Sequence, residues 1–331
     1  MKSITNILKY LLFFIIGFGL LWYTFRNQSL EDIYYKISHA HLGWVMLSLV
    51  ISSMALISRS MRWNLLIEPL GYKPKLLSSF YSLMVGYFAN LAIPRIGEIS
   101  RCGALSKAED IPFNKLIGTV IIERFSDLLM LIVSIIILAM TEYELLGGFL
   151  SDKIINPILN GVQNSAVLLI VIAVVFVVTG IIIWKWLQSP SSGNLKLRIR
   201  NILNDVLEGL KSVFRMKNGY AFIGHTLFIW LMYFLMMYVS FFAMEPTSGL
   251  GIKAGLFVMV VGGIAMSAPV QGGIGTYHLL VSQGLMVYHV SAEDGIAFAT
   301  LVHTWQLILL IVLGTWSLIA LFRKKKLLPA T

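Results

Sequence analysis

Long apolar runs are the feature that most limits how this chain can fold. Nine of them follow one another through 331 residues, and many approach the roughly 20 residues that cross a bilayer as a helix. Only 13% of the residues are charged, against about 25% in a soluble domain. We therefore expect an all-α, polytopic integral membrane protein that forms a single membrane domain over residues 1–331. The runs are Leu8–Phe25, Leu42–Ser58, Leu77–Ile93, Leu116–Met140, Val167–Trp186, Tyr220–Met244, Ala254–Ala268, Thr276–His289 and Ala297–Phe322.

The net charge of +10 would indicate a nucleic-acid partner in a soluble protein. Here the bases lie in segments between apolar runs, where they would face the anionic cytoplasmic leaflet. We therefore expect membrane lipids as partners and no nucleic acid. Lys2 and Lys9 precede the first run as in a signal peptide, but no small-residue cleavage site follows, which predicts an uncleaved anchor. Cys102 is the only cysteine, so an intrachain disulfide is excluded.

Two basic segments flank the third apolar run, and both are typical of cytoplasmic loops. A full crossing between them would place one basic group outside. We therefore predict a re-entrant hairpin over residues 77–108, which enters from the cytoplasm, breaks at Pro94 and returns. The alternative is an ordinary kinked span. The bases concerned are Arg59, Arg62, Lys73 and Lys75 before the run, and Arg95, Arg101, Lys107 and Lys115 after it.

The region from Pro246 to Gly295 carries Lys253 as its only base, which predicts an external location. Its two short apolar segments predict a second re-entrant hairpin over residues 254–290, entering from outside. About six full spans plus two hairpins then result, with both termini cytoplasmic, in the cytoplasmic (inner) membrane. Paired interrupted segments in corresponding halves indicate an inverted repeat and a transport site where the tips meet. Two ordinary kinked spans, giving eight crossings, remain the alternative.

A further element is expected in the basic segment before the sixth run. Apolar residues recur with helical spacing between Ile199 and Phe214, and bases occupy the other positions. This pattern predicts a cytoplasmic amphipathic helix over residues 194–217 that lies on the inner leaflet. A role in gating a cytoplasmic entrance and a role as passive connector both fit.

Charged residues next to a broken helix suggest a polar site inside the membrane. Glu123, Arg124 and Asp127 interrupt the fourth run, and ionisable groups in a membrane are costly unless they are paired. Pro94 and Gly97 break the third run, and a broken backbone in lipid needs protein or a wet cavity around it. The alternative is a structural ion-pair cluster that locks two elements together.

An anionic headgroup is the ligand that we expect at this site, because guanidinium groups match phosphate in a bidentate fork. Arg95, Arg101 and Arg124 would contact the headgroup. The carboxylates would hold these arginines and compete for them; they are Glu98, Glu123 and Asp127. Arg59 and Arg62 either snorkel to the inner interface or form the site entrance.

The second hairpin carries a glycine-rich break that we expect to form an external gate. Pro269 precedes Gly272, Gly273 and Gly275, which allow close backbone approach. His278 follows, and together with His225 and His303 it is a candidate proton carrier, although hydrogen-bonded packing is the more ordinary role. No metal-ligand spacing links the histidines, and we expect neither a metal nor a cofactor.

These motifs together resemble the transmembrane, flippase-like domain of the lysylphosphatidylglycerol synthase family, from roughly Ser58 to Leu280. The resemblance implies a polytopic lipid transporter, with Asn90 among the residues at the substrate. Some members carry a soluble aminoacyl-transferase domain, which is absent from these 331 residues, so lipid synthesis is not implied. His278 stands where the family often has a glutamate. The matching pieces are Arg62-Trp63; Asn90 with Pro94-Arg95, Gly97-Glu98 and Arg101; Glu123-Arg124 with Asp127; and Pro269 with Gly272-Gly273-Ile274-Gly275.

The function expected from the sequence is therefore a flippase-like transporter, not an enzyme, that moves a lipid with a polar or anionic headgroup between leaflets. One alternative is a membrane enzyme acting on a lipid phosphate, which would need a metal cluster or an activated nucleophile. The other is a non-transporting membrane scaffold.

Overall fold

The computed structural model describes residues 2–142, 148 and 216–326, and this part contains helices and no strand. The all-α prediction is therefore confirmed. The predicted span Val167–Trp186 lies outside the described residues, as does the predicted amphipathic helix 194–217 apart from its last two residues. The helices are α1 Lys2–Phe25, α2 Leu30–Ser38, α3 Leu42–Ile67, α4 Leu76–Ala92, α5 Gly97–Glu109, α6 Phe113–Thr141, α11 Gly219–Ser240, α12 Glu245–Ser248, α13 Ile252–Ser267, α14 Thr276–Met286 and α15 Ala292–Lys326, with 3₁₀ turns η1 Glu68–Leu70, η4 Phe241–Ala243 and η5 Gln271–Gly273.

Within the described residues, three stretches of helix are long and apolar enough to cross a membrane: Leu42–Leu70, Gly219–Ala243 and Ala292–Arg323. Shorter apolar helices cover Phe14–Phe25, Leu76–Ala92 and Ile252–Ser267. The chain is thus a multi-pass membrane protein. Helix α6 has 29 residues, or about 43 Å at 1.5 Å per residue, although charged residues interrupt its apolar character.

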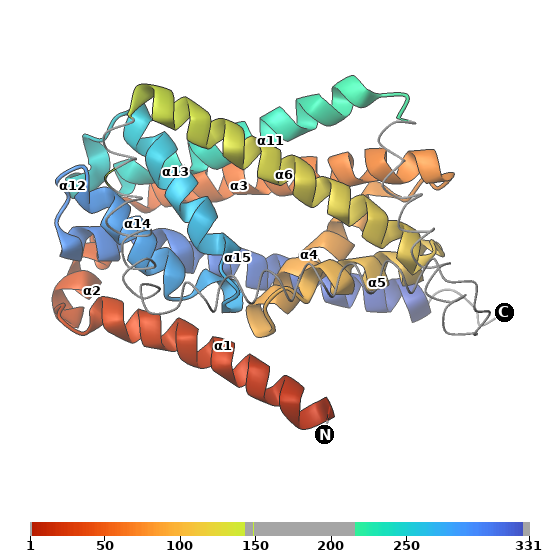
Figure 1. Cartoon of the computed structure of the whole chain (residues 1–331), viewed down its shortest axis with the longest axis horizontal. Helices are drawn as coiled ribbons and strands as arrows, with labels where there is room; N and C mark the ends of the chain where they lie inside the picture. Colours follow the sequence, from red (N-terminus) through yellow and green to blue (C-terminus); the bar gives the residue numbers. More distant parts are fainter. Residues whose placement is uncertain (1, 143–147, 149–215, 327–331) are drawn as a thin grey trace, which may run out of the picture.

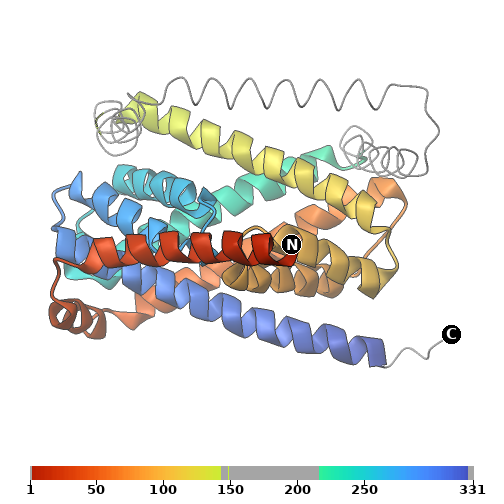
Figure 2. The same ribbon diagram turned by 60° about the horizontal axis from the view of Figure 1, so that its bottom comes forward.

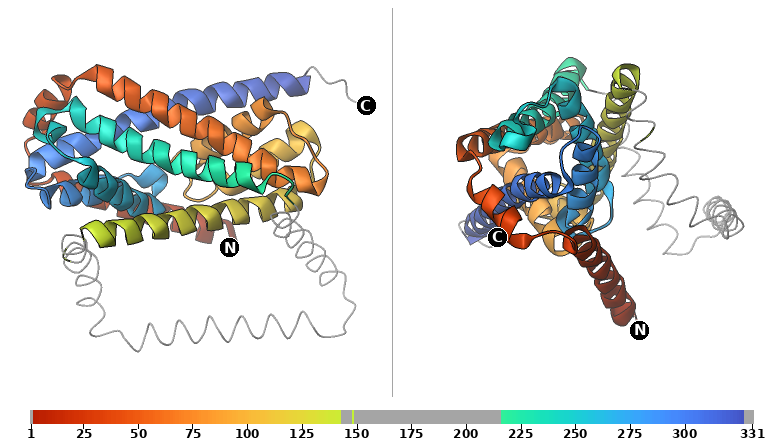
Figure 3. Two further views of the ribbon diagram at one scale, coloured as in Figure 1. Left: turned by 90° about the horizontal axis from the view of Figure 1, so that it is seen from above. Right: turned by 90° about the vertical axis from the view of Figure 1, so that its left-hand side faces the viewer.

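Four long helices, α3, α6, α11 and α15, run along the long axis of the molecule (Figure 1). Seen from above, α3 and α11 lie side by side over most of their length (Figure 3, left). Helix α1 lies across the outside of α14 (Figure 2) and projects away from the bundle (Figure 3, right). We call the end of the bundle that holds α2 and α12 the α2 end, and the opposite end the α5 end.

Two helical hairpins enter the bundle from opposite ends (Figure 1). The α4–α5 hairpin starts and finishes at the α5 end, and the α13–α14 hairpin does so at the α2 end. Their tips meet inside the bundle, where Arg95 Nη2 donates to the Ser267 carbonyl oxygen at 2.6 Å. The reversals sit at the interruptions that the sequence indicates. Their depth in a bilayer stays a prediction.

The turn of the α4–α5 hairpin follows from the residues around Pro94. Proline has no N–H to continue a helix, and Arg95 takes the left-handed conformation with φ 62°. The Asn90 side-chain oxygen then accepts a hydrogen bond from the Gly97 N–H at 2.7 Å, at the start of α5. This bond joins the two arms of the hairpin directly behind the turn.

The α2 end is closed by apolar packing and by a surface ion pair. Phe241, Phe257 and Phe298 are fully buried in the largest apolar core. Lys36 Nζ lies 2.7 Å from carboxylate oxygens of both Glu293 and Asp294, which connects α2 to the start of α15. The charged network in the half toward the α5 end is buried, unlike this surface pair.

Candidate functional site

Five charged side chains from three helices form one buried network, which we call the charge cluster. Its arginines are almost fully buried, and so is Glu123. Asp127 is the least buried member, with its side chain 16% exposed. The cluster consists of Arg59 and Arg62 from α3, Arg101 from α5, and Glu123 and Asp127 from α6.

Glu123 is the centre of the charge cluster. Its Oε2 accepts a hydrogen bond from Arg101 Nη1 at 2.9 Å, and its Oε1 accepts one from Arg59 Nη2. Arg62 Nη2 lies 3.6 Å from the same Oε1. One carboxylate thus binds guanidinium groups from two other helices, in a region where an unpaired charge would be very costly.

Asp127 completes the network one helical turn after Glu123, on the same face of α6. It accepts hydrogen bonds from Arg62 Nη2 at 2.7 Å and from Arg59 Nη2 at 3.1 Å. The two α3 arginines also reach α11: Arg59 Nη1 donates to the Tyr233 hydroxyl at 2.9 Å, and Arg62 Nη1 donates to Thr226 Oγ1 at 3.3 Å. The cluster therefore fastens α3, α5, α6 and α11 together.

The charge cluster carries more positive charge and more donors than it uses. Three guanidinium groups face two carboxylates, which leaves a formal charge of +1. Among the described residues, the Nε atoms of Arg59, Arg62 and Arg101 and the Nη2 of Arg101 are buried without a hydrogen-bond partner. Buried donors of this kind are expensive unless something accepts from them. An anion would match both the charge and the donors.

Arg101 is further positioned by aromatic packing. Its guanidinium carbon lies 4.8 Å from the ring centroid of Trp63, a fully buried residue of α3. The Trp63 indole N–H in turn donates to Thr119 Oγ1 on α6 at 2.9 Å. The indole thus holds the arginine through a cation–π contact while anchoring α3 to α6.

A second ion pair lies at the more open edge of this region. Arg124 Nη2 lies 2.8 Å from Glu98 Oε1, with the two side chains 46% and 28% exposed. Arg124 could pair with Asp127, three residues later on α6, but in the structure its partner is Glu98 of α5. Arg124 follows Glu123 by one position, so it points about 100° away from the buried face of α6.

Four other residues of the predicted site have the following places in the structure. Arg59 and Arg62 are 4% and 0% exposed, so they belong to the charge cluster and neither snorkel nor line an entrance. Arg95 is exposed and lies at the hairpin tip, bonded to a backbone carbonyl. Asn90 accepts from the Gly97 N–H, so it fastens the turn of its own hairpin.

Two members of the network were missed at the sequence level. Tyr233 and Thr226 lie in an apolar run whose aromatic residues are typical of ordinary membrane packing. Their only signal is a hydroxyl in a buried span, which usually needs a hydrogen-bond partner. For Arg59 and Arg62, the sequence does indicate that the two side chains act together, because a spacing of three residues places both on one face of α3.

The glycine-rich break forms the tip of the α13–α14 hairpin, and packing requires glycine there. Gly273 and Gly275 have φ of 78° and 84°, a region that favours glycine. A Cβ on Gly275 would lie 2.2 Å from the Gly17 carbonyl oxygen of α1. Pro269 precedes this turn, and His278 lies in the first turns of α14 behind it. Of the charge cluster, Arg101 lies on the α4–α5 hairpin, whereas the glycine turn forms the tip of the other hairpin.

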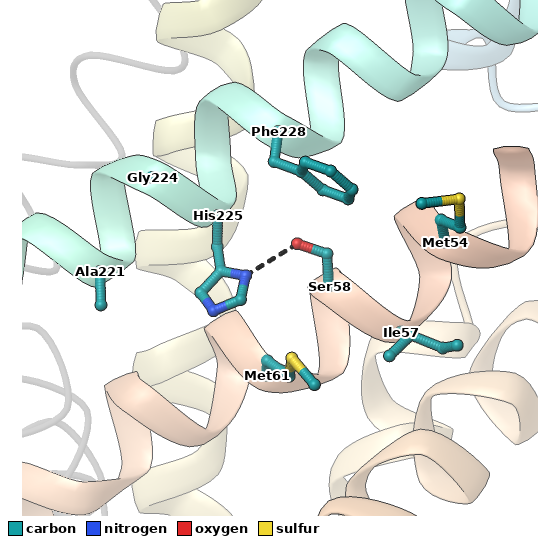
Figure 4. A pocket seen from close by; sticks show the side chains of 8 residues that line it. All are labelled: Met54, Ile57, Ser58, Met61, Ala221, Gly224, His225 and Phe228. Atoms are coloured by element: carbon teal, nitrogen blue, oxygen red, sulfur yellow. Dashed lines mark hydrogen bonds between the residues drawn. The ribbon is translucent and has the colours of Figure 1, made fainter.

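A shallow, largely apolar cavity of about 560 Å³ opens between α3 and α11 on the outer side of the bundle. Figure 4 shows Ser58 and His225 facing each other across it, with Ser58 Oγ 2.9 Å from His225 Nδ1. Exposed side chains of α3 such as Met54 and Ile57 form its wall. None of the residues expected at the headgroup lines it, so it is a separate feature of the lipid-facing surface.

The described residues do not gather metal-ligating side chains at one place. In this part of the chain, no three side chains of His, Cys, Asp or Glu gather closely enough to hold a metal ion. The charge cluster in particular contributes only two such residues. The polar contacts that its side chains make are ion pairs and hydrogen bonds.

Comparison with known proteins agrees with the membrane architecture. A family model described as the lysylphosphatidylglycerol synthase TM region matches residues 6–314. A UPF0104 membrane protein of Methanocaldococcus jannaschii is 28% identical over 125 residues, which is 37% of this chain and 37% of that protein. The match thus spans little more than a third of the relative's length. No solved structure matches the chain.

Proposed function

Because this chain belongs to the lysylphosphatidylglycerol synthase TM region family, we propose that it moves a lipid with a polar or anionic headgroup between the two leaflets of the membrane. The family supports a function connected with membrane lipids. The finer proposal of transport, without chemical change of the lipid, rests on the charge cluster and on the two hairpins.

The observation that carries this proposal is the uncompensated charge inside the α5 half of the bundle. A formal charge of +1 and four unpartnered guanidinium nitrogen atoms lie among apolar helices. A lipid phosphodiester has one negative charge and several acceptor oxygens. Hydrogen bonds to a charged group contribute about 1.5–3 kcal/mol each, so a headgroup phosphate would offset the cost of these buried donors.

The route begins at the ion pair between Arg124 and Glu98, the most accessible charged pair beside the cluster. We place this end on the cytoplasmic side, together with both termini, in the inner membrane. A phosphate that approaches Arg124 competes with Glu98 for the guanidinium. The headgroup can then move to the donors of Arg101, while its acyl tails stay in the lipid.

The two hairpins supply the gates of this route. They come from opposite ends, and we interpret α3 to α6 and α11 to α15 as inverted halves, each holding one long helix pair and one hairpin. The contact between Arg95 and the Ser267 carbonyl closes the space between the tips in this structure. Movement of one hairpin against the other would open the site to one side at a time.

Replacing Arg124 by alanine tests the route. We expect lipid movement in proteoliposomes to slow by about tenfold, because one charge-assisted contact of at least ~1.4 kcal/mol is lost. The measurement follows labelled phosphatidylglycerol and an uncharged diacylglycerol, with chromatography to verify that the lipids stay chemically unchanged. Arg26→Ala is the matched control, because Arg26 is exposed on the far side and packs only over Trp22 and Tyr23 in the described structure. Equal phosphatidylglycerol rates for Arg124→Ala and Arg26→Ala would refute the route.

A further inference from the structure

Two histidines form a second buried polar group, in the half of the bundle opposite the charge cluster. His278 of α14 is 6% exposed and His303 of α15 is 4% exposed. Their ring centroids are 5.1 Å apart, and the rings are nearly perpendicular. The pair lies beside the glycine turn, since a Cβ added to Gly273 would lie 3.7 Å from His303 Cε1.

Each ring has a nitrogen for which the described residues provide no partner. These atoms are His278 Nδ1 and His303 Nε2, and both are buried. A buried polar atom without a hydrogen bond costs about 1–3 kcal/mol, and two in one place call for an explanation. Neutral imidazole nitrogens of this kind can take up a proton when water reaches them.

Among the described residues, no carboxylate contacts either ring of the pair, so none would hold a proton there permanently. Tyr277 is the titratable neighbour, and its ring stacks on His303 with centroids 4.7 Å apart. From the other elements, α1 presents Phe25 to His278, α4 presents Leu91 to the glycine turn, and α13 presents Met266. In the part of the chain that the structure describes, two charged groups of other elements reach this hairpin: Arg95 bonds to the Ser267 carbonyl at its tip, and Glu142 pairs with Lys253 at the start of α13.

We propose that His278 and His303 form a proton-binding site that couples a proton to lipid movement. The inference rests on the proposed transport function. In the closed arrangement described here, an imidazolium would be buried without a counter-charge, which is highly unfavourable. When the two hairpins separate at their tips, water enters together with the headgroup, and one ring then takes a proton from that side onto its free nitrogen. Binding of a second proton is opposed, because the two charges would lie about 5 Å apart.

The charge of this protonated pair gives the coupling a physical basis. The proton supplies one positive charge in the half of the bundle that lacks arginines of the charge cluster. An anionic headgroup released from Arg101 would then meet a compensating charge on its way to the α2 end. One proton and one monoanion move together, so the pair is neutral as it passes the apolar centre.

A pH gradient across proteoliposomes tests the coupling. For one proton per lipid, a gradient of one pH unit should shift the steady-state ratio of phosphatidylglycerol between leaflets by about tenfold. His303→Gln and His278→Gln should each abolish this shift. The matched control is His39→Gln, at an exposed histidine of the α2 end, which should keep it. A transporting wild-type protein that shows no shift would overturn the proposal, as would a shift that survives in both variants.

A second measurement uses the wild-type protein alone, so it depends neither on lipid transport nor on whether a variant folds. Nuclear magnetic resonance of ¹⁵N-histidine in the full-length wild-type protein in micelles should show His278 and His303 taking up one proton between them on acidification. Independent titration of the two rings would overturn the site. If no lipid moves at all, the proposed function fails, whereas a shared proton would still support the histidine site itself.

Discussion

The variant Glu123→Gln is expected to lose about 3–5 kcal/mol of stability and all lipid movement, because one partner is removed from a buried ion-pair network. Glutamine has nearly the same shape as glutamate, so the change removes charge and not volume. Glu123 is fully buried and accepts from Arg59 and Arg101. Without its charge, three guanidinium groups face only Asp127, and the formal charge of the cluster rises from +1 to +2. Unfolding of the purified protein in detergent measures the loss.

The matched control for this change is Glu98→Gln, in the same half of the bundle. Its side chain is 28% exposed, and its partner Arg124 is 46% exposed. An exposed ion pair contributes at most about 1 kcal/mol, so Glu98→Gln should unfold close to wild type. If both variants unfolded alike, burial of Glu123 would have no special energetic weight, and the charge cluster would not be what holds α3, α5 and α6 together.

The hairpins and the charged helix could be predicted from sequence because their signals are local. Pro94 and the glycines near Pro269 interrupt apolar runs that are otherwise continuous. The spacing of four residues between Glu123 and Asp127 predicts a shared helix face. Each of these signals lies within one turn of helix, so no knowledge of the tertiary structure is needed to detect them.

Pairing across helices could not be predicted in the same way. Arg59 and Arg62 were expected at the interface or at the site entrance because they follow the apolar run that ends at Ser58, yet α3 continues to Ile67 and buries them. The pair of His278 and His303 forms only because α14 and α15 pack together, and the 24 intervening residues include a turn. Such contacts depend on helix packing, which hydropathy and charge patterns do not encode.

The difference between local sequence signals and contacts between helices also applies to Asn90 and Gly97. Both belong to the motif that resembles the family, and the motif alone suggested a substrate contact for Asn90. In the structure the Asn90 side chain bonds to the Gly97 N–H, seven residues on and in the next helix. The hairpin is therefore stabilised by its own motif residues, and Arg101, which we propose to contact the headgroup, comes later in α5.

The close approach of α4 and α5 leads to the second large effect, which we expect for Gly97→Ala. A Cβ at this position would lie 2.3 Å from the Gly86 carbonyl oxygen and 2.5 Å from Asn90 Nδ2. Backbone cannot yield as a flexible side chain does, so the two arms must separate. We expect a loss of about 3 kcal/mol or more, at the upper end of overpacking costs. Thermal unfolding in detergent gives the measurement.

If the two arms separate, the charge cluster is disturbed as well. The same substitution should therefore lower both stability and transport. Arg101 follows Gly97 by four residues on the same face of α5, and its Cβ lies 3.0 Å from a Cβ added to Gly86. If α5 moves outward, Arg101 withdraws from Glu123, so phosphatidylglycerol movement should fall together with the unfolding temperature. Gly103→Ala is the control in the same helix, because nothing lies within 4 Å of its added Cβ and alanine favours the helix by about 0.5–1 kcal/mol. Similar behaviour of the two variants would mean that α4 and α5 do not touch at Gly86 and Gly97, and that the hairpin does not set the position of Arg101.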